Sequence, residues 1–234
     1  MSKPVESFAQ LHEELQQFRD DNTWIYRGQG NPDWPLVPSA GRPPFSGRDD
    51  LKYFEGWKRR AARFINPSTI QNDWQWLQIA QHHGLPTRLL DWTWGPLVAT
   101  FFALWNQSVE NKSGRTTDAV VYAYQWDGRY VSDETKITDV KTISLVKSTE
   151  VASRISSQNA LFTIHPNPTQ PMIVDEINIK TIKIKASAQR ELLRELNHYG
   201  VNRASIFEDL DGLSEHISWS IADNSNWTHG RPIE

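Results

Sequence analysis

The chain has 234 residues, a formal net charge of −3 and no cysteine. The small acidic excess gives no overall attraction to nucleic acid or to anionic membranes, and the lack of cysteine excludes disulfides, thiolate metal ligands and cysteine nucleophiles. No apolar stretch has the length of a signal peptide or a membrane span, so we expect a cytoplasmic protein without a membrane partner. No linker divides the sequence, and residues 1–234 are expected to form a single domain.

The first half of the chain predicts helices separated by short strands. Apolar residues at spacings of three and four predict a helix over Val5–Phe18. Trp24–Tyr26 is predicted to be a short buried strand that ends at Arg27 and Gly28. The proline-rich stretch 31–48 excludes regular structure and predicts a long ordered loop. The next expected elements are helices at 50–64 and 74–83, a strand at 88–92, and a helix from Pro96 to Trp105.

From Ala119 onward, alternating and β-branched residues predict mainly strands. These strands are expected at 119–126, 135–146, 160–165 and 177–186. A helix follows over Ser187–Tyr199, with Ser187 as its N-cap, and a last helix covers 205–221, interrupted at Gly212. The order predicts an α+β fold, in which N-terminal helices precede a mixed or antiparallel sheet that the late helices cover.

Two stretches combine polar and aromatic residues in a way that is typical of a pocket wall. The longer is QHHGLPTRLLDWTWGPLVATFFALW at residues 81–105, and the shorter is WIYRGQ at residues 24–29. A core segment would carry fewer polar groups, and a surface loop would carry fewer aromatic rings. Ligand pockets join large apolar surfaces to a few fixed polar groups, so both stretches are candidate site segments.

Arg27 is the candidate anion-binding residue. It stands at the end of a predicted buried strand, and its guanidinium offers a rigid fork of donors for phosphate or carboxylate. Gly28 would allow a sharp turn or the close approach of a ligand. The alternative is that Arg27 pairs with an internal acid or leaves the strand into solvent, and the spacing alone favours that plainer interpretation.

Asp91 lies inside an apolar run, where an unpaired carboxylate is costly. Arg88 and Arg27 are therefore its expected partners. An Arg–Asp pair that fixes two loops is as well supported by the sequence as a catalytic role for Asp91. Thr93 is either the N-cap of the following helix or a substrate contact.

Two histidines, His82 and His83, end a predicted helix, where the helix dipole favours them. Neighbouring residues do not share a helix face, so at most one of the two is expected to face a pocket. Nothing nearby has the spacing of metal ligands, and no metal is expected. Another polar and aromatic stretch, with Arg154, Gln158 and Phe162, is either a helix end before a strand or part of a site.

The motifs together resemble the FRG domain family. They are Tyr26–Gly28, residues 81–104, RISSQNALFTIH at 154–165, and NRASIFEDLDGLSEHI at 202–217. The middle block follows the family pattern Q-H-[aromatic or His]-G-x-P-T-R-L-L-D-W-T. The resemblance covers most of the chain and implies one FRG-like domain with a core over about 22–218.

A looser resemblance in motif order is to ADP-ribosyltransferases of the Arg-Ser-Glu type, and it implies a related fold. By this resemblance Arg27 would hold the phosphate of NAD, Asp91-Trp92-Thr93 would shape the nicotinamide pocket, and Gln158 would occupy the glutamate position. The Ser-Thr-Ser motif is absent, and glutamine cannot offset developing positive charge as a carboxylate does. Asp91 would then take that role, or the transfer chemistry is absent.

We therefore expect a nucleotide-type cleft that binds or cleaves NAD, or transfers ADP-ribose, as in a toxin or phage-defence effector. The expected catalytic residues are Asp91, Gln158 and His83, and the expected ligand-binding residues are Tyr26, Arg27, Gly28, Arg88, Trp92 and Thr93. They are predicted to converge on one cleft, lined by Trp92 or Trp94.

Two alternatives stay open. A nucleic-acid-binding or nuclease-like effector would use a basic cluster formed by Lys58, Arg59, Arg60 and Arg63, although the net charge makes nucleic acid the less expected partner. A non-catalytic interaction domain would need the polar network only as a scaffold.

Overall fold

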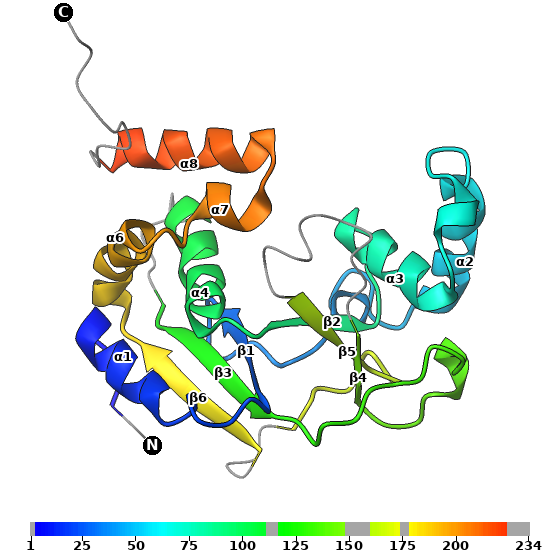
Figure 1. Ribbon diagram of the computed structural model, residues 1–234, viewed down its shortest axis with the longest axis horizontal. Helices are drawn as coiled ribbons and strands as arrows, with labels where there is room; N and C mark the ends of the chain where they lie inside the picture. Colours follow the sequence, from blue (N-terminus) through cyan, green and yellow to red (C-terminus); the bar gives the residue numbers. More distant parts are fainter. Residues whose placement is uncertain (1–2, 111–116, 148–159, 174–177, 224–234) are drawn as a thin grey trace, which may run out of the picture.

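A computed structural model describes residues 3–110, 117–147, 160–173 and 178–223 (Figure 1). Within these residues the strands form one antiparallel sheet in the order β4-β5-β2-β1-β3-β6. The predicted α+β fold with an antiparallel sheet is confirmed. The strands are β1 (Trp24–Gln29), β2 (Leu89–Thr93), β3 (Ala119–Gln125), β4 (Ser144–Val146), β5 (Ala160–Ile164) and β6 (Ile179–Ile184).

The helices lie in two groups over one face of the sheet (Figure 1). Over β1, β3 and β6, α1 (Phe8–Gln16), α4 (Pro96–Glu110) and α6 (Gln189–His198) bury a core around Tyr26, Val121 and Leu196. Beside β2 and β5, α2 (Asp50–Ala61) and α3 (Asp73–His82) bury a second core. The short helix α7 (Arg203–Phe207) and α8 (Leu210–Ala222) follow α6. None of the described helices is both long and apolar enough to cross a membrane.

The proline-rich loop covers part of the opposite face of the sheet, and it is not wholly irregular as predicted, since Ser39–Gly41 form a 3-10 turn. Ile25, Leu90 and Trp92 point to this face and pack with Leu36 of the proline-rich loop and with Met172. Successive side chains along a strand point to opposite faces of the sheet. Because Leu90 and Trp92 point away from the helices, Asp91 and Thr93 of the same strand point toward them. The predicted long ordered loop is therefore part of the core.

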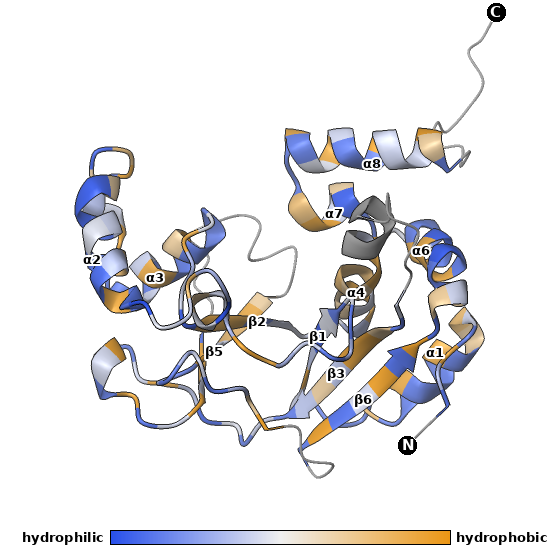
Figure 2. Cartoon of the chain, turned by 180° about the vertical axis from the view of Figure 1, so that it is seen from behind, coloured by the Kyte–Doolittle hydropathy of each residue, from blue (hydrophilic) through white to orange (hydrophobic). Residues whose placement is uncertain are grey.

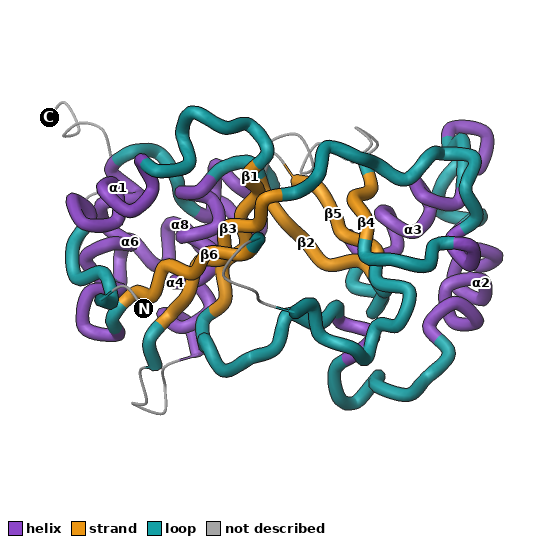
Figure 3. The backbone as a smooth tube through the Cα atoms, turned by 90° about the horizontal axis from the view of Figure 1, so that it is seen from below, coloured by secondary structure: helices purple, strands orange, loops and turns teal. Residues whose placement is uncertain are grey.

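The two central strands meet at one end and then separate. Cα partners join β1 and β2 only at Tyr26 and Thr93, whereas β1 pairs with β3 along its whole length and β2 does so with β5. Figure 3 shows β1 and β2 diverging from this point. The sheet thus consists of two halves, and Arg27 and Asp91 lie where the halves part.

Three predictions about the second half of the chain are wrong. The helix after β6 begins at Gln189 rather than at a Ser187 N-cap, because Ala186–Ala188 form a 3-10 turn whose first N–H donates to Asp118. The last predicted helix is two helices, divided at Glu208, whose φ of 45° ends α7. Gly212 lies inside α8, and its N–H donates to the N-cap Asp209. The predicted strand 135–146 is a strand only at 144–146, since a 3-10 turn occupies 137–139.

Candidate active site

A cleft of about 340 Å³ lies over the point where β1 and β2 separate. Its floor comes from the two central strands and the start of β5. Its walls come from α3 on one side and from α4 and α7 on the other. The lining residues are Tyr26, Arg27, Gly28, Gln78, Gln81, His82, Asp91, Trp92, Thr93, Ala99, Phe102, Ala160, Phe162 and Phe207.

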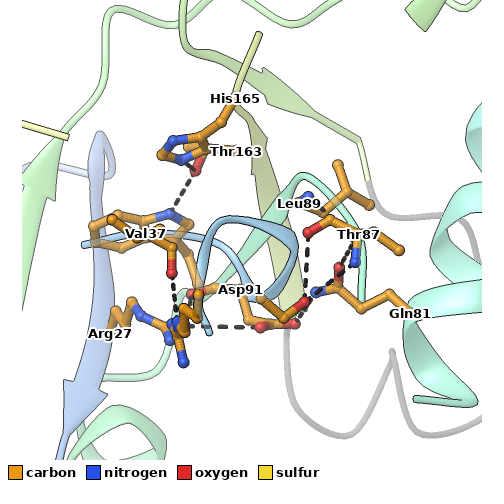
Figure 4. A network of polar contacts seen from close by, with 11 residues as sticks. Arg27, Val37, Gln81, Thr87, Leu89, Asp91, Thr163 and His165 are labelled. Carbon is orange, nitrogen blue, oxygen red and sulfur yellow. Dashed lines mark hydrogen bonds and ion pairs between the residues drawn. The ribbon is translucent and has the colours of Figure 1, made fainter. Parts of the chain in front are cut away.

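Arg27 reaches from β1 across the gap to β2. Its Nη1 donates to the backbone oxygen of Asp91 at 2.7 Å and lies 3.7 Å from the Oδ2 atom of the same residue (Figure 4). The side chain is only 14% exposed, and its Nε is buried without a hydrogen-bond partner among the described residues. Burial lowers the pKa of Arg27 to about 10, against the opposing effect of Asp91. The guanidinium is therefore charged at neutral pH, and its Nε–H group lacks a hydrogen-bond acceptor among the described residues.

Asp91 is the partner of Arg27, and its carboxylate is 60% exposed. Gln81 Nε2 donates to Asp91 Oδ1 at 2.6 Å, and the hydroxyl of Thr87 donates to Gln81 Oε1. Leu89 N–H donates to the same hydroxyl of Thr87 at 3.1 Å. This chain of hydrogen bonds, drawn in Figure 4, orients Asp91 from the start of β2 and from α3. One carboxylate oxygen is thus held while the other faces Arg27.

Beneath the cleft, the side chain of Trp92 packs in the core on the opposite face of the sheet. Its ring is 2% exposed, and its Nε1 donates to the hydroxyl of Thr163 at 3.0 Å. The same hydroxyl of Thr163 is hydrogen-bonded to Nε2 of His165, 3.1 Å away. Burial, with the nearby charge of Arg27, lowers the pKa of His165 to about 4. This histidine is therefore neutral at pH 7 and adds no second charge below Arg27.

Gly28 has a packing role that differs from the expected close approach of a ligand. A Cβ atom at this position would lie 2.6 Å from the backbone nitrogen of Ala103 and even closer to the carbonyl oxygen of Ala99. The backbone of α4 thus rests directly on β1. This contact places Phe102 of the same helix on the wall of the cleft.

The structure brings six of the nine expected site residues to one cleft. These are Tyr26, Arg27, Gly28, Asp91, Trp92 and Thr93. The hydroxyl of Thr93 accepts from Gly95 N–H at 3.0 Å, so Thr93 closes the turn before α4 and is not its N-cap. Trp94 lines a neighbouring groove of about 730 Å³ instead.

Two expected residues lie elsewhere, and those expectations are corrected. Arg88 precedes β2, and its Nε and Nη2 donate to the two carboxylate oxygens of Asp50 at 2.8 and 2.7 Å, so it is held by α2 away from the cleft lining. His83 is the exposed C-cap of α3, whereas His82 lines the cleft. Gln158 lies outside the described residues, and its role stays a prediction.

Several cleft residues were not predicted from the sequence. Gln78 and Gln81 lie three residues apart on α3, a spacing that places them on one side of the helix; Gln78 is buried and Gln81 is half-buried. Phe207 and Phe102 come from separate helices, and no local pattern links them. Arg42 is a second cation near Arg27. Its charge lowers the pKa of Arg27, and the charge of Asp91 raises the pKa of both arginines.

Comparison with known proteins supports the family resemblance. Residues 22–112 match the model of the FRG domain. No curated protein and no solved structure matches the chain. The matched segment includes both β1 and β2, which supply Arg27 and Asp91. The chain therefore contains an FRG domain.

Proposed function

We propose that the cleft binds a phosphate-bearing nucleotide of the NAD type and breaks its bond to nicotinamide. The observation that carries this proposal is the state of Arg27, a buried guanidinium with an unpartnered Nε at the floor of a cleft. Burying a cation whose donors are unsatisfied is costly. A phosphate group would supply the acceptors that the protein lacks there, because guanidinium and phosphate match in charge and in donor geometry.

The cleft walls favour a nucleotide over a simple inorganic anion. Phe102, Phe162 and Phe207 offer aromatic surface for a flat heterocycle. Gln81 lines the same cleft and orients the carboxylate of Asp91 toward it. The volume of about 340 Å³ falls in the usual range for small-molecule sites, roughly 300–1,000 Å³. An NAD molecule would place its phosphates at Arg27 and one ring between these walls.

Asp91 is suited to stabilise the positive charge that develops on the ribose. In the proposed step the bond between ribose C1′ and the nicotinamide nitrogen breaks, and its electron pair stays with nicotinamide. Water or an acceptor nucleophile then bonds to C1′ and loses a proton. The exposed carboxylate of Asp91, fixed by Gln81, faces the cleft in which C1′ would lie. His82 replaces His83 as the cleft histidine that would accept the proton.

This proposal agrees with the motif order shared with ADP-ribosyltransferases of the Arg-Ser-Glu type. It also keeps Gln158 as the residue predicted for the glutamate position. A protein with this activity would suit a toxin or phage-defence effector, because loss of NAD or modification of a target would stop growth.

The experiment that tests the chemistry is NAD turnover by wild type and by Asp91→Asn, followed by mass spectrometry of released nicotinamide. The substitution keeps the size of the side chain and removes its charge. We expect turnover to fall about 100-fold or more, the usual loss when one group that stabilises transition-state charge is removed. Asp127→Asn is the matched control, because the Asp127 side chain is similarly exposed, at 59%, and pairs with Arg129.

Three outcomes would contradict the proposed chemistry. Wild type could release no nicotinamide with or without an added acceptor protein. Asp91→Asn could retain full turnover. The melting temperature of Asp91→Asn could fall while NAD has no effect on either protein, which is the result that a non-catalytic scaffold predicts.

A further inference from the structure

The exposed face of α2 carries cations and aromatic rings in two adjacent rows. Tyr53, Arg60 and Phe64 are separated by seven and four residues, and Lys52, Arg59 and Arg63 repeat the same spacing one position earlier. Lys52, Tyr53, Arg59 and Arg60 belong to α2, whereas Arg63 and Phe64 belong to the turn that follows Ala61. The spacings place each row along one side of the helix and of this turn, and the two together are called the exposed face of α2. All six residues are exposed, whereas Phe54 and Ala61 of the same helix are buried in the core beside α3. Figures 1 and 2 show α2 at the outer edge of the molecule.

The cations of this face are available to a partner. Lys52, Arg59 and Arg63 make no ion pair with any of the described residues. Lys58, which the sequence grouped with them, is instead bound to Asp73 at 2.6 Å. Of the acids within α2, Asp50 is buried against Arg88, and Glu55 lies 3.7 Å from Lys58. A local positive excess therefore lies on a chain whose net charge is −3, and this contrast favours a polyanionic partner.

The aromatic rings give this face a second kind of contact. Tyr53 is 56% exposed and Phe64 is 74% exposed, and the guanidinium of Arg63 lies 4.5 Å from the centroid of the Phe64 ring. A pocket of about 370 Å³ lies at the beginning of α2. Tyr53, Phe45, Pro44 and Arg48 line it. Asp50, which Arg88 neutralises, also lines it. The two aromatic rings and the cation of Arg48 suit a single flat ring that carries a phosphate.

We infer that the exposed face of α2 binds single-stranded nucleic acid. Phosphates contact Arg59, Arg60 and Arg63, and unpaired bases stack on Tyr53 and Phe64, with one base in the pocket beside Tyr53. Stacking on side chains requires bases that are not already stacked in a duplex. A membrane fits less well, because an interfacial helix presents a continuous apolar face, and here charged residues separate the two rings.

This surface is distinct from the cleft, since no residue of α2 lines it. The inference therefore goes beyond the proposed NAD chemistry, and neither depends on the other. Arg27→Ala is expected to bind nucleic acid like wild type, so failure of one proposal would leave the other intact.

The test is fluorescence anisotropy with labelled oligo(U), oligo(dT) and a DNA duplex over a range of salt concentrations. We expect Arg59→Gln/Arg63→Gln to weaken binding to the single strands about tenfold or more. Each phosphate contact contributes about 0.7 to the slope of log affinity against log salt for single strands, so the slope should fall by about 1.4. Tyr53→Ala/Phe64→Ala should weaken binding and leave the slope unchanged.

Arg19→Gln/Arg129→Gln is the matched control. It removes the same charge from two exposed arginines outside α2, with side chains 70% and 85% exposed, and should bind like wild type. The inference is overturned if wild type binds neither single strand, if the duplex is bound more tightly than the single strands, or if the control weakens binding as much as Arg59→Gln/Arg63→Gln. Binding to phosphatidylserine vesicles without binding to either oligonucleotide would also overturn it.

Discussion

Replacing Gly28 by alanine is expected to lower the free energy of unfolding by about 3 kcal/mol, the upper part of the usual range for overpacking. The new Cβ would lie 2.6 Å from the backbone nitrogen of Ala103 and 2.9 Å from its Cβ, and closer to the oxygen of Ala99. Backbone atoms of a buried helix cannot move aside as a flexible side chain can, so α4 must shift away from β1.

Urea denaturation measures this loss, and Gly56→Ala is the matched control. Gly56 lies in α2, where an added Cβ meets only the end of the Arg60 side chain at 3.3 Å. Because alanine is favoured over glycine in helices by about 0.8–1.0 kcal/mol, this control should be neutral or stabilising. A Gly28→Ala protein as stable as wild type would show that α4 does not rest on β1 in the way described.

Asp50→Ala is expected to destabilise the fold by about 3–5 kcal/mol, because it leaves a buried arginine without its counter-ion. The two side chains are 11% and 8% exposed and share two hydrogen bonds. Arg88 also donates to the backbone oxygen of Pro166 at 3.2 Å. The pair thus ties the beginning of α2 to the beginning of β2 and to the end of β5.

Two comparisons show whether the loss of stability comes from leaving a buried charge unpaired rather than from removing an ion pair as such. Asp73→Ala removes the partner of Lys58, a pair with exposed fractions of 27% and 53%, and should cost no more than about 1 kcal/mol. Arg88→Met combined with Asp50→Leu should be less destabilising than Asp50→Ala alone, since no charge then remains buried. If Asp50→Ala costs no more than Asp73→Ala in urea denaturation, the pair is not buried in solution.

The sequence predicted the local elements well because their signals are local. The spacing of apolar residues located the first helix, although it extended the helix too far at both ends. Val5 instead forms a bridge with Ile184 of β6, and Phe18 is buried beyond the end of the helix. A residue can be apolar because of the sheet or the loop that it contacts, and periodicity alone does not separate these causes from a helix face.

The break between the last two helices shows a different limit. Glu208 takes a left-handed backbone conformation, which a glutamate seldom adopts, so no residue preference marks the position. Gly212 did suggest a break, yet it lies inside α8 because Phe207 and Asp209 pack closely against it. The tertiary contact explains the glycine, and the sequence could not reveal that contact.

For the candidate site, the sequence motifs predicted the strand residues that form the floor of the cleft, but not the helix residues that form its walls. Arg27 and Asp91 lie in short polar and aromatic motifs on adjacent strands, and the sequence correctly offered Arg27 as a partner of Asp91. It also offered Arg88, which pairs with Asp50, 38 residues away. The choice between two arginines depends on which way each side chain points from its strand. Phe207 reaches the cleft only through the packing of α7, which no local pattern encodes.

The central claim is that Arg27 holds a phosphate of the bound nucleotide, and phosphorus NMR tests it most directly. The diphosphate resonances of NAD would be recorded with wild type, with Arg27→Ala and with Arg129→Ala, whose arginine is exposed and outside the cleft. We expect the resonances to shift and broaden with wild type and with Arg129→Ala, and to match free NAD with Arg27→Ala. Resonances that respond equally to Arg27→Ala and wild type, or that respond to neither, would contradict the claim.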